Sequence, residues 1–218
     1  AKIFPQLLSE ERQKLYRILE KNVLSDIFSY LENPKEYLDE LSNDLAADIL
    51  ESMDSDDAID VLEELEENNR NELIELMDEE AVAEIKLIKS YDDDMIGSRM
   101  TTNYIAIDKN STIKQAMKKM IEEAAINDNV SMIYFTDLNN EFYGAMDLRD
   151  LIIARENENL QSIIKTSYPY LKATELVSDC INKIQEYALD SIPVVDDCMH
   201  LIGVITSDDI LEAVSDEF

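Results

Sequence analysis

The fold of the C-terminal half is decided by one stretch, SIPVVDDCMHLIGVITSDDIL, residues 191–211. It begins with a short β-branched run, Ile192 to Val195, which ends at Asp196 and Asp197. Short apolar runs bounded by turn residues are typical of buried strands. Pro193 has no backbone N–H to donate, so it favours a place among the first residues of a strand or at a sheet edge.

The second part of this stretch predicts another strand and then a helix. Leu201 to Ile205 is apolar, and Gly203 marks a position where we expect no room for a side chain. Thr206 is followed by Ser-Asp-Asp, a combination that is typical of a helix start. The expected order is therefore strand, turn, strand, helix.

The same pattern occurs earlier, as MIYFTDLNNEFYGAMDLRDLI at residues 132–152. The two stretches align at an offset of 59 residues. The alignment places Asp137 on Asp196, Gly144 on Gly203 and Asp150 on Asp209. An internal repeat of this kind predicts two copies of one structural unit.

Residues 1–90 predict helices only, and their apolar residues recur every 12 positions from Asp44 onward. The recurring residues are Ile49, Val61, Leu73 and Ile85, with Met53, Leu65 and Met77 at the same spacing. A period of 12 allows about two helical turns and a short connection. The expected connections, which are rich in N-cap and first-turn residues, are 54–57, Asn68-Asn69 and 78–80. Short helices at a fixed period predict a superhelical array.

The chain is strongly acidic, with a formal net charge of −30. Between Glu32 and Glu84 there are 21 Asp and Glu residues against Lys35 and Arg70, a net charge of −19. Binding to nucleic acid or to an anionic membrane surface needs clustered Lys and Arg, so we expect neither partner. A divalent cation or a basic protein is the natural counterpart, although a solvated acidic face is also a common reason for such a bias.

The repeated unit, strand–helix–strand–strand–helix with the ending G-h-h-[ST]-x-x-D, resembles a CBS domain. GVITSDD in the second copy matches this ending, whereas GAMDLRD in the first copy has Asp147 in place of Ser or Thr. Two copies in order resemble a tandem CBS domain pair. The resemblance also implies an adenine-nucleotide function, in which Thr206 and Asp209 hold a ribose.

The whole chain is similar to the cytosolic region of MgtE-type magnesium transporters. The similarity rests on DSDDAIDVLEEL at 54–65, the segment YDDDMIGSRMT at 91–101, and the second CBS ending SDDILEAV. It implies an all-α superhelical domain followed by an α+β tandem CBS pair. The expected boundaries are 1–90 for the helical domain, 91–99 for a linker, and 100–160 and 161–218 for the two CBS domains.

Asp56 and Asp60 are candidate Mg²⁺ ligands, because residues four apart share a helix face and repel one another when unneutralised. Complementarity with the helix dipole explains Asp56 but not Asp60. The resemblance implies further Mg²⁺ ligands at Asp209, Glu212 and Glu217. Asp209 has two alternative roles, as half of a capping box with Thr206 or as a ribose ligand.

Cys180 and Cys198 are the only cysteines, and His200 is the only histidine. Without a CxxC pair, the simpler interpretation is two reduced thiols in or near a core, with a disulfide or metal pair as the alternative. We expect His200 to pack or face solvent. The chain contains no GxSxG, HExxH or Walker sequence, so an enzyme is not expected.

The resemblance implies a function and several partners. We expect an intracellular Mg²⁺ sensor that gates a magnesium transporter from the cytoplasmic face of the cell membrane. It would be a homodimer through the CBS domains, joined to a C-terminal transmembrane channel domain that this chain lacks. A chain that begins at Ala1 fits a piece of a longer protein. The alternatives are an adenine-nucleotide sensor that responds to ATP or AMP, and a scaffold that binds a basic protein.

Overall fold

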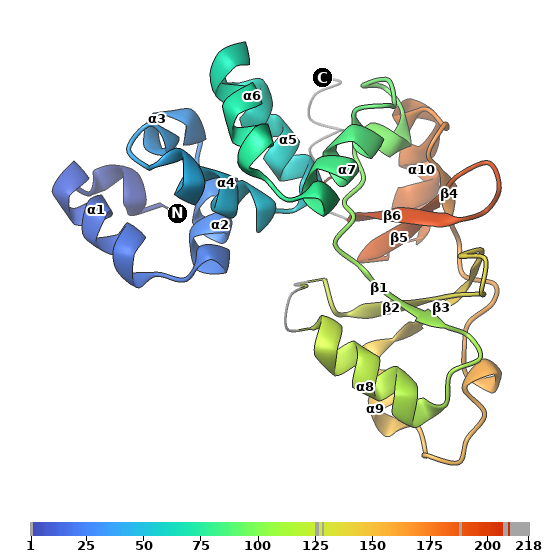
Figure 1. Cartoon of the computed structure of the whole chain (residues 1–218). Coiled ribbons are helices and arrows are strands. Elements are labelled where there is room, and N and C mark those ends of the chain that lie inside the picture. Colours follow the sequence, from blue (N-terminus) through green and yellow to red (C-terminus); the bar gives the residue numbers. More distant parts are fainter. Residues whose placement is uncertain (1, 125–126, 128, 188, 207–208, 210–218) are drawn as a thin grey trace. The chain divides into compact units, whose positions relative to one another are not determined.

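The computed structural model describes residues 2–124, 127, 129–187, 189–206 and 209. The chain forms two compact units, Ala1–Leu87 and Ile88–Phe218, and each is described by itself (Figure 1). Within the described residues, no helix combines the length and the apolar character needed to span a bilayer.

The N-terminal unit consists of short helices, as expected (Figure 1). After a 3₁₀ turn at Phe4–Gln6 they are α1 (Ser9–Ile18), α2 (Lys21–Ser29), α3 (Pro34–Leu38), α4 (Asn43–Glu51), α5 (Ser55–Glu63), α6 (Glu67–Leu76) and α7 (Glu79–Ile88). The last four begin 12 residues apart, which confirms the predicted period.

The 12-residue period places one core residue in each helix. Ile49, Val61 and Leu73 are buried, and so are Met53, Leu65 and Met77 at the helix ends. Helix α4 packs on α2 and α6, so each short helix buries its apolar face on neighbours. Asn68 and Asn69 lie in the first turn of α6, in agreement with their prediction as N-cap and first-turn residues. Their amides do not interrupt the helix, since polar residues are well tolerated in a first turn.

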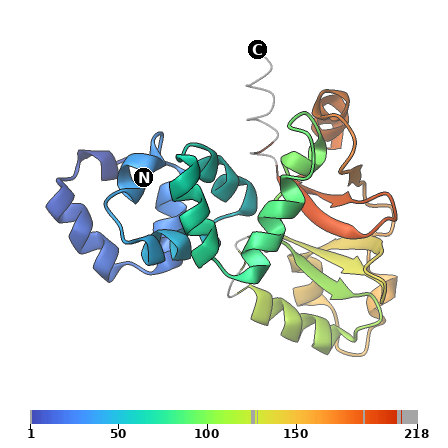
Figure 2. The ribbon, with the colours of Figure 1, turned by 45° about the horizontal axis from the view of Figure 1, so that its top comes forward.

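The second unit contains two similar three-stranded sheets (Figure 2). The first repeat comprises β1 (Ile105–Asp108), α8 (Ile113–Glu123), β2 (Met132–Thr136), β3 (Phe142–Asp147) and α9 (Leu148–Ile153). The second comprises β4 (Leu171–Lys172), α10 (Val177–Tyr187), β5 (Ser191–Val195) and β6 (Leu201–Thr206). In each sheet the central strand pairs parallel with the first strand and antiparallel with the third.

The bounds of the second and third strands of the two repeats coincide at the predicted offset of 59 residues, whereas those of β1 and β4 do not. A small apolar cluster joins the two sheets, with Tyr134 and Ala145 from the first against Leu201 and Val204 from the second. The two sheets therefore share a core.

Each repeat is crossed by the segment that leads into the other one. Thr101 exchanges both backbone hydrogen bonds with Val204 of β6, at 2.8 and 2.9 Å, and Lys165 does the same with Ala145 of β3, at 2.9 and 3.2 Å. A Cβ atom at Gly203 would lie 2.6 Å from the Met100 sulfur, which confirms that no side chain fits there. The crossing chain is therefore the reason for this glycine.

Pro193 lies in a central strand, not at the sheet edge or the strand start that we expected. It stands opposite Val204, whose backbone N–H and C=O both bond Thr101 and so face away from β5. The Pro193 nitrogen therefore points toward β4, which pairs only with Val194 and Val195. The missing N–H breaks no ladder hydrogen bond, because β4 is too short to reach it.

The segment that follows α7 is bonded to the second repeat. Ile96 N donates to the carbonyl of Glu175, and Gly97 N donates to that of Ala173, both at 2.9 Å. Val177 N donates in turn to the carbonyl of Asp94 at 2.9 Å. These bonds fix residues 94–97 against the start of α10.

Candidate functional site

The predicted acidic ligands of the N-terminal unit lie on helix α5. Asp54 occupies its N-cap position, and Asp56 and Asp57 belong to its first turn, where carboxylates complement the helix dipole. Asp56 is half-buried, whereas Asp60, one turn further on, is exposed. Helix α5 therefore presents carboxylate oxygens, which are the donors that hard cations such as Mg²⁺ prefer.

The predicted ligands of the second repeat follow strand β6. Thr206 N donates to Asp209 Oδ2 at 2.7 Å, and Asp209 N lies 3.5 Å from Thr206 Oγ1. This reciprocal pair is the capping-box arrangement, one of the alternatives that the sequence left open for Asp209. Glu212 and Glu217 lie outside the described residues. Asp56 and Asp60 belong to one unit and Asp209 to the other, so each group is described by itself.

The equivalent site in the first repeat has different partners. Asp147 takes the position of Thr206 and makes no side-chain capping bond. Its carboxylate pairs instead with the ammonium group of Lys165, which also lies 3.8 Å from Asp150 Oδ2. The hydrogen bond to Asp147 is the main reason that the pKa of Lys165 is raised.

Beside this ion pair lies a pocket of about 630 Å³. It is lined by residues 164–169, which connect the two repeats, and by Tyr187 and Leu189. Burial raises the pKa of Tyr168 to about 12, and the negative charges of Asp147 and Asp190 contribute. The Tyr168 hydroxyl donates to the Ser191 carbonyl at 3.1 Å, which holds this ring in place. The pocket combines two aromatic rings, an ammonium group and a nearby pair of carboxylates.

The two cysteines differ in their surroundings. Cys180 is buried in α10, but Cys198 is exposed, so the expectation that both thiols lie in or near a core was wrong for Cys198. Cys198 lies in the turn between β5 and β6, outside both strands. His200 follows in the same turn, half-buried, with its Nδ1 atom 2.8 Å from Asp196 Oδ2.

Comparison with protein families finds different family matches for the N-terminal part of the chain and for the rest. A model described as the MgtE intracellular N domain matches residues 1–94, and the CBS domain model matches residues 93–157 and 160–216. The CBS matches together span more than half of the chain.

The chain belongs to the CBS domain family and has an MgtE-type N domain.

Relatives and solved structures agree with this assignment. The magnesium transporter MgtE of Enterococcus faecalis is 39% identical over 98% of this MgtE-type chain, which spans 48% of that protein. The MgtE of Thermus thermophilus is 26% identical over 65% of the chain, which spans 31% of it. The chain thus spans less than half the length of these curated relatives.

Two crystal structures match nearly the whole chain. The soluble part of a magnesium transporter has a TM-score of 0.91 at 30% identity, covering 99% of this chain and 86% of that one. The cytosolic domain of the Mg²⁺ channel MgtE in complex with ATP has a TM-score of 0.85 at 25% identity, covering 97% and 88%. The predicted fold class, an all-α domain followed by a tandem CBS pair, is confirmed.

Sequence reasoning missed the group formed by Asp147, Asp150 and Lys165 beside the pocket. The repeat alignment contained a signal for it, because Asp150 aligns with Asp209, which we had singled out. Lys165 had no such signal. It reaches the two carboxylates only because the segment that contains it pairs with β3 of the first repeat.

Proposed function

We propose that this chain is the Mg²⁺-sensing regulatory region of a magnesium transporter, acting at the cytoplasmic face of the cell membrane. The observation that supports it best is the match of 99% of the chain to the soluble part of a magnesium transporter. The net charge of −19 between Glu32 and Glu84 supports it independently, because such a surface attracts divalent cations.

The proposed sensor switches between two conformations. Without a divalent cation, carboxylates of the helical domain and of the CBS pair repel, and the helical domain moves away. Mg²⁺ held by Asp56 and Asp60 on one side, and by Asp209, Glu212 and Glu217 on the other, favours a compact state. A ligand that binds one state better shifts the population toward it. The compact state holds an attached transmembrane channel domain closed.

Small-angle X-ray scattering of the chain with MgCl₂ and with KCl of equal ionic strength tests this proposal. We expect millimolar MgCl₂ to reduce the radius of gyration more than KCl, because KCl only screens the repulsion. The Mg²⁺-specific compaction is the reduction of the radius of gyration by MgCl₂ beyond that by KCl. Asp56→Asn combined with Asp60→Asn should weaken it, and so should Asp209→Asn combined with Glu212→Gln. Neutralisation also removes repulsion, so both variants should be more compact than the wild type without Mg²⁺.

A matched control separates the bridge from charge reduction alone. Glu75→Gln combined with Glu79→Gln removes the same charge from exposed positions of the same unit. This control should keep the Mg²⁺-specific compaction. A variant that combines the Asp56 and Asp60 substitutions with those at Asp209 and Glu212 should lose less Mg²⁺-specific compaction than the sum of the two separate losses. Either pair of substitutions already breaks a shared bridge. Equal responses to the two salts, or strictly additive losses, would contradict the proposal.

The proposed homodimer uses the first CBS domain. Ile121 on α8 and Ile152 and Ile153 on α9 are 60%, 59% and 67% exposed, and the two helices pack together. Ile152→Asp combined with Ile153→Asp should convert a dimer to a monomer in light scattering at tens of micromolar. Leu138→Asp is the control, because Leu138 is 86% exposed in a turn and should leave the dimer intact. A wild-type monomer would contradict the proposal.

A second candidate function is adenine-nucleotide binding in the 630 Å³ pocket. It is supported by the chemistry of the pocket, where Tyr168 and Tyr187 offer ring faces and Lys165 a positive charge for phosphate. The MgtE relative whose structure contains ATP supports it as well. Calorimetric titration with ATP and with AMP, in the presence and absence of Mg²⁺, tests this function separately from Mg²⁺ sensing.

A further inference from the structure

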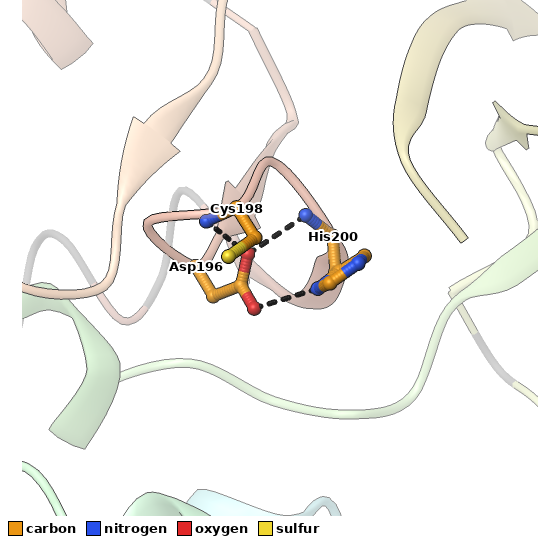
Figure 3. Close-up of side chains that lie close together, drawn as sticks. All are labelled: Asp196, Cys198 and His200. Atoms are coloured by element: carbon orange, nitrogen blue, oxygen red, sulfur yellow. Dashed lines mark hydrogen bonds and ion pairs between the residues drawn. The ribbon is translucent and has the colours of Figure 1, made fainter. Parts of the chain in front are cut away.

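The turn between β5 and β6 holds three potential metal ligands that the Mg²⁺ proposal does not use. They are Asp196, Cys198 and His200, and their ligand atoms lie within 4.8 Å of one another. Figure 3 shows the Cys198 sulfur and the His200 ring on either side of the Asp196 carboxylate. All three are reachable from solvent, because Cys198 is exposed and the side chains of His200 and Asp196 are 38% and 32% exposed.

The Asp196 carboxylate is already oriented within this turn. Its Oδ1 atom accepts hydrogen bonds from the backbone N–H groups of Cys198 and His200, both at 2.8 Å. Its Oδ2 atom lies 2.8 Å from His200 Nδ1. Burial opposes ionisation of Asp196, but the bonds from His200 and Cys198 outweigh it and lower the pKa of this carboxyl. A metal ion bound by Oδ2 and Nδ1 leaves both backbone bonds to Oδ1 in place.

The backbone of the turn does not require Cys198 or His200. In the first repeat, Asp137 Oδ1 accepts from the N–H groups of Asn139 and Glu141, at 2.8 and 3.1 Å, in the same arrangement. Asn139 and Glu141 occupy the positions of Cys198 and His200 at the offset of 59. The same aspartate–backbone bonds therefore form in both turns, whichever side chains stand at the positions of Cys198 and His200.

The ligand types select the class of metal. Mg²⁺ and Ca²⁺ prefer oxygen, whereas thiolate and imidazole favour zinc and its neighbours among the divalent transition metals. Three protein ligands with an open fourth position are common in zinc sites. With bonds of about 2.0 to 2.3 Å, ligand atoms around a tetrahedral ion lie roughly 3.3 to 3.7 Å apart. The three ligand atoms lie within 4.8 Å of one another, so a bound metal requires the Cys198 and His200 side chains to rotate until their atoms reach this separation.

The surroundings add negative charge to this site. Glu141 stands opposite His200 in an isolated bridge between the two turns, and Asp197 follows Asp196 directly. The nearby ammonium group of Lys172 lies 3.6 Å from Asp197 Oδ1 and only partly offsets this charge. A cation is therefore favoured over an anion here.

We propose that Asp196, Cys198 and His200 form a binding site for a divalent transition metal ion of the zinc type. The site shares no residue with the proposed Mg²⁺ ligands, so the two proposals can be tested independently. The metal joins positions 196, 198 and 200 of a single turn, and that turn is bonded to its counterpart in the first repeat. Phe142 N donates to Met199 O at 2.8 Å, and Leu201 N donates to Asn140 O at 3.0 Å.

Calorimetric titration of the reduced chain with ZnCl₂, in a large excess of MgCl₂, tests this site. The excess Mg²⁺ occupies the acidic surface, so that the remaining heat reports ligands of another kind. We expect one equivalent of Zn²⁺ per chain. Cys198→Asn combined with His200→Glu, which installs the first repeat's residues at these two positions, should weaken Zn²⁺ binding at least about tenfold. Cys198→Ser is a second variant in case the exchanged turn folds poorly.

Cobalt adds a direct readout of the thiolate. With CoCl₂ the wild type and Cys180→Ala should show a thiolate-to-cobalt charge-transfer band, and the Cys198 variants should lack it. The reciprocal exchange, Asn139→Cys combined with Glu141→His, should add a second equivalent of Zn²⁺, because the first turn has the same backbone. The proposal is overturned if the wild type binds no Zn²⁺ in excess Mg²⁺, or if the Cys198 variants bind as tightly as the wild type. Failure of the reciprocal exchange would overturn the claim that the turn backbone positions the ligands.

Discussion

The two CBS repeats share one backbone but differ in the side chains at their functional positions. Both turns are organised by an aspartate, and both third strands contain a glycine under a crossing chain. At the end of the third strand the first repeat has the ion pair of Lys165 with Asp147, and the second has the capping pair of Thr206 and Asp209. Shared residues therefore build the fold. The candidate sites combine shared aspartates, such as Asp196 and Asp150, with side chains in which the two copies differ.

The largest expected effect tests the shared glycines. A Cβ atom at Gly144 would lie 2.6 Å from the backbone oxygen of Lys165. At Gly203 it would lie 2.6 Å from the side-chain sulfur of Met100 and 3.0 Å from the backbone oxygen of Thr101, and a side chain can shift more easily than backbone. Neither glycine has a positive φ, so an alanine costs only steric overlap. We expect Gly144→Ala to lower the free energy of unfolding by about 3 kcal/mol and Gly203→Ala by about 1 kcal/mol.

Urea unfolding of the full chain measures this difference. The comparison needs no outside control, because each variant serves as the control for the other. A larger loss for Gly203→Ala than for Gly144→Ala would mean that the two crossing segments are not fixed as the hydrogen bonds to Thr101 and Lys165 indicate.

Sequence reasoning found most of the fold because the fold depends on periodic and local signals. The 12-residue period placed α4 to α7, and the offset of 59 placed β2 and β3 against β5 and β6, but not β1 against β4. It could not find that Met100 and Thr101 cross onto the second repeat, because that pairing joins residues about a hundred positions apart. The prediction for Pro193 was wrong because it depends on a neighbouring strand. The length of β4 decides whether the missing N–H of Pro193 leaves a hydrogen bond unmade.

The candidate sites were less predictable than the fold. Asp56 and Asp60 were predicted from helical spacing and family resemblance, but spacing does not show which groups lie opposite them. The sequence predicts Cys198 as a thiol in or near a core, with a disulfide or metal pair as the alternative, and His200 as a residue that packs or faces solvent. Nothing in the sequence links the two. Their proximity follows from a turn in which Met199 has a positive φ of 69°. Composition and spacing do not reveal such a backbone conformation.

A second prediction asks which repeat holds a nucleotide. The pocket borders Lys165, which pairs with Asp147 and lies near Asp150, whereas Asp209 is engaged in a capping box. We expect Asp150→Asn to weaken ATP binding about tenfold, which corresponds to the loss of one charged hydrogen bond to a ribose. Asp209→Asn should change ATP affinity less than about twofold.

Isothermal titration with ATP measures both variants against the wild type. Lys165→Met is the companion variant. It should weaken the binding of ATP more than the binding of AMP, because it removes a positive charge near the phosphates. If Asp209→Asn has the larger effect, the nucleotide belongs to the second repeat at Thr206 and Asp209.

The smallest expected effect concerns the turn residues with positive φ, Asn140 at 64° and Met199 at 69°. Left-handed backbone costs most L-residues about 1 kcal/mol or more, but asparagine tolerates it through local hydrogen bonds. Asn140 Nδ2 also donates to the Leu201 carbonyl at 2.9 Å, a bond that Met199 cannot make in return. Met199→Asn should therefore raise the free energy of unfolding by about 1 kcal/mol, and the reciprocal Asn140→Met should lower it. By the symmetry of the repeats, the new amide at position 199 would face the Phe142 carbonyl. Thermal unfolding of the two variants beside the wild type measures the gain and the loss of stability. A loss of stability in Met199→Asn would contradict this prediction. It would show that side-chain packing of Met199 stabilises the second turn more than the backbone that it shares with the first turn.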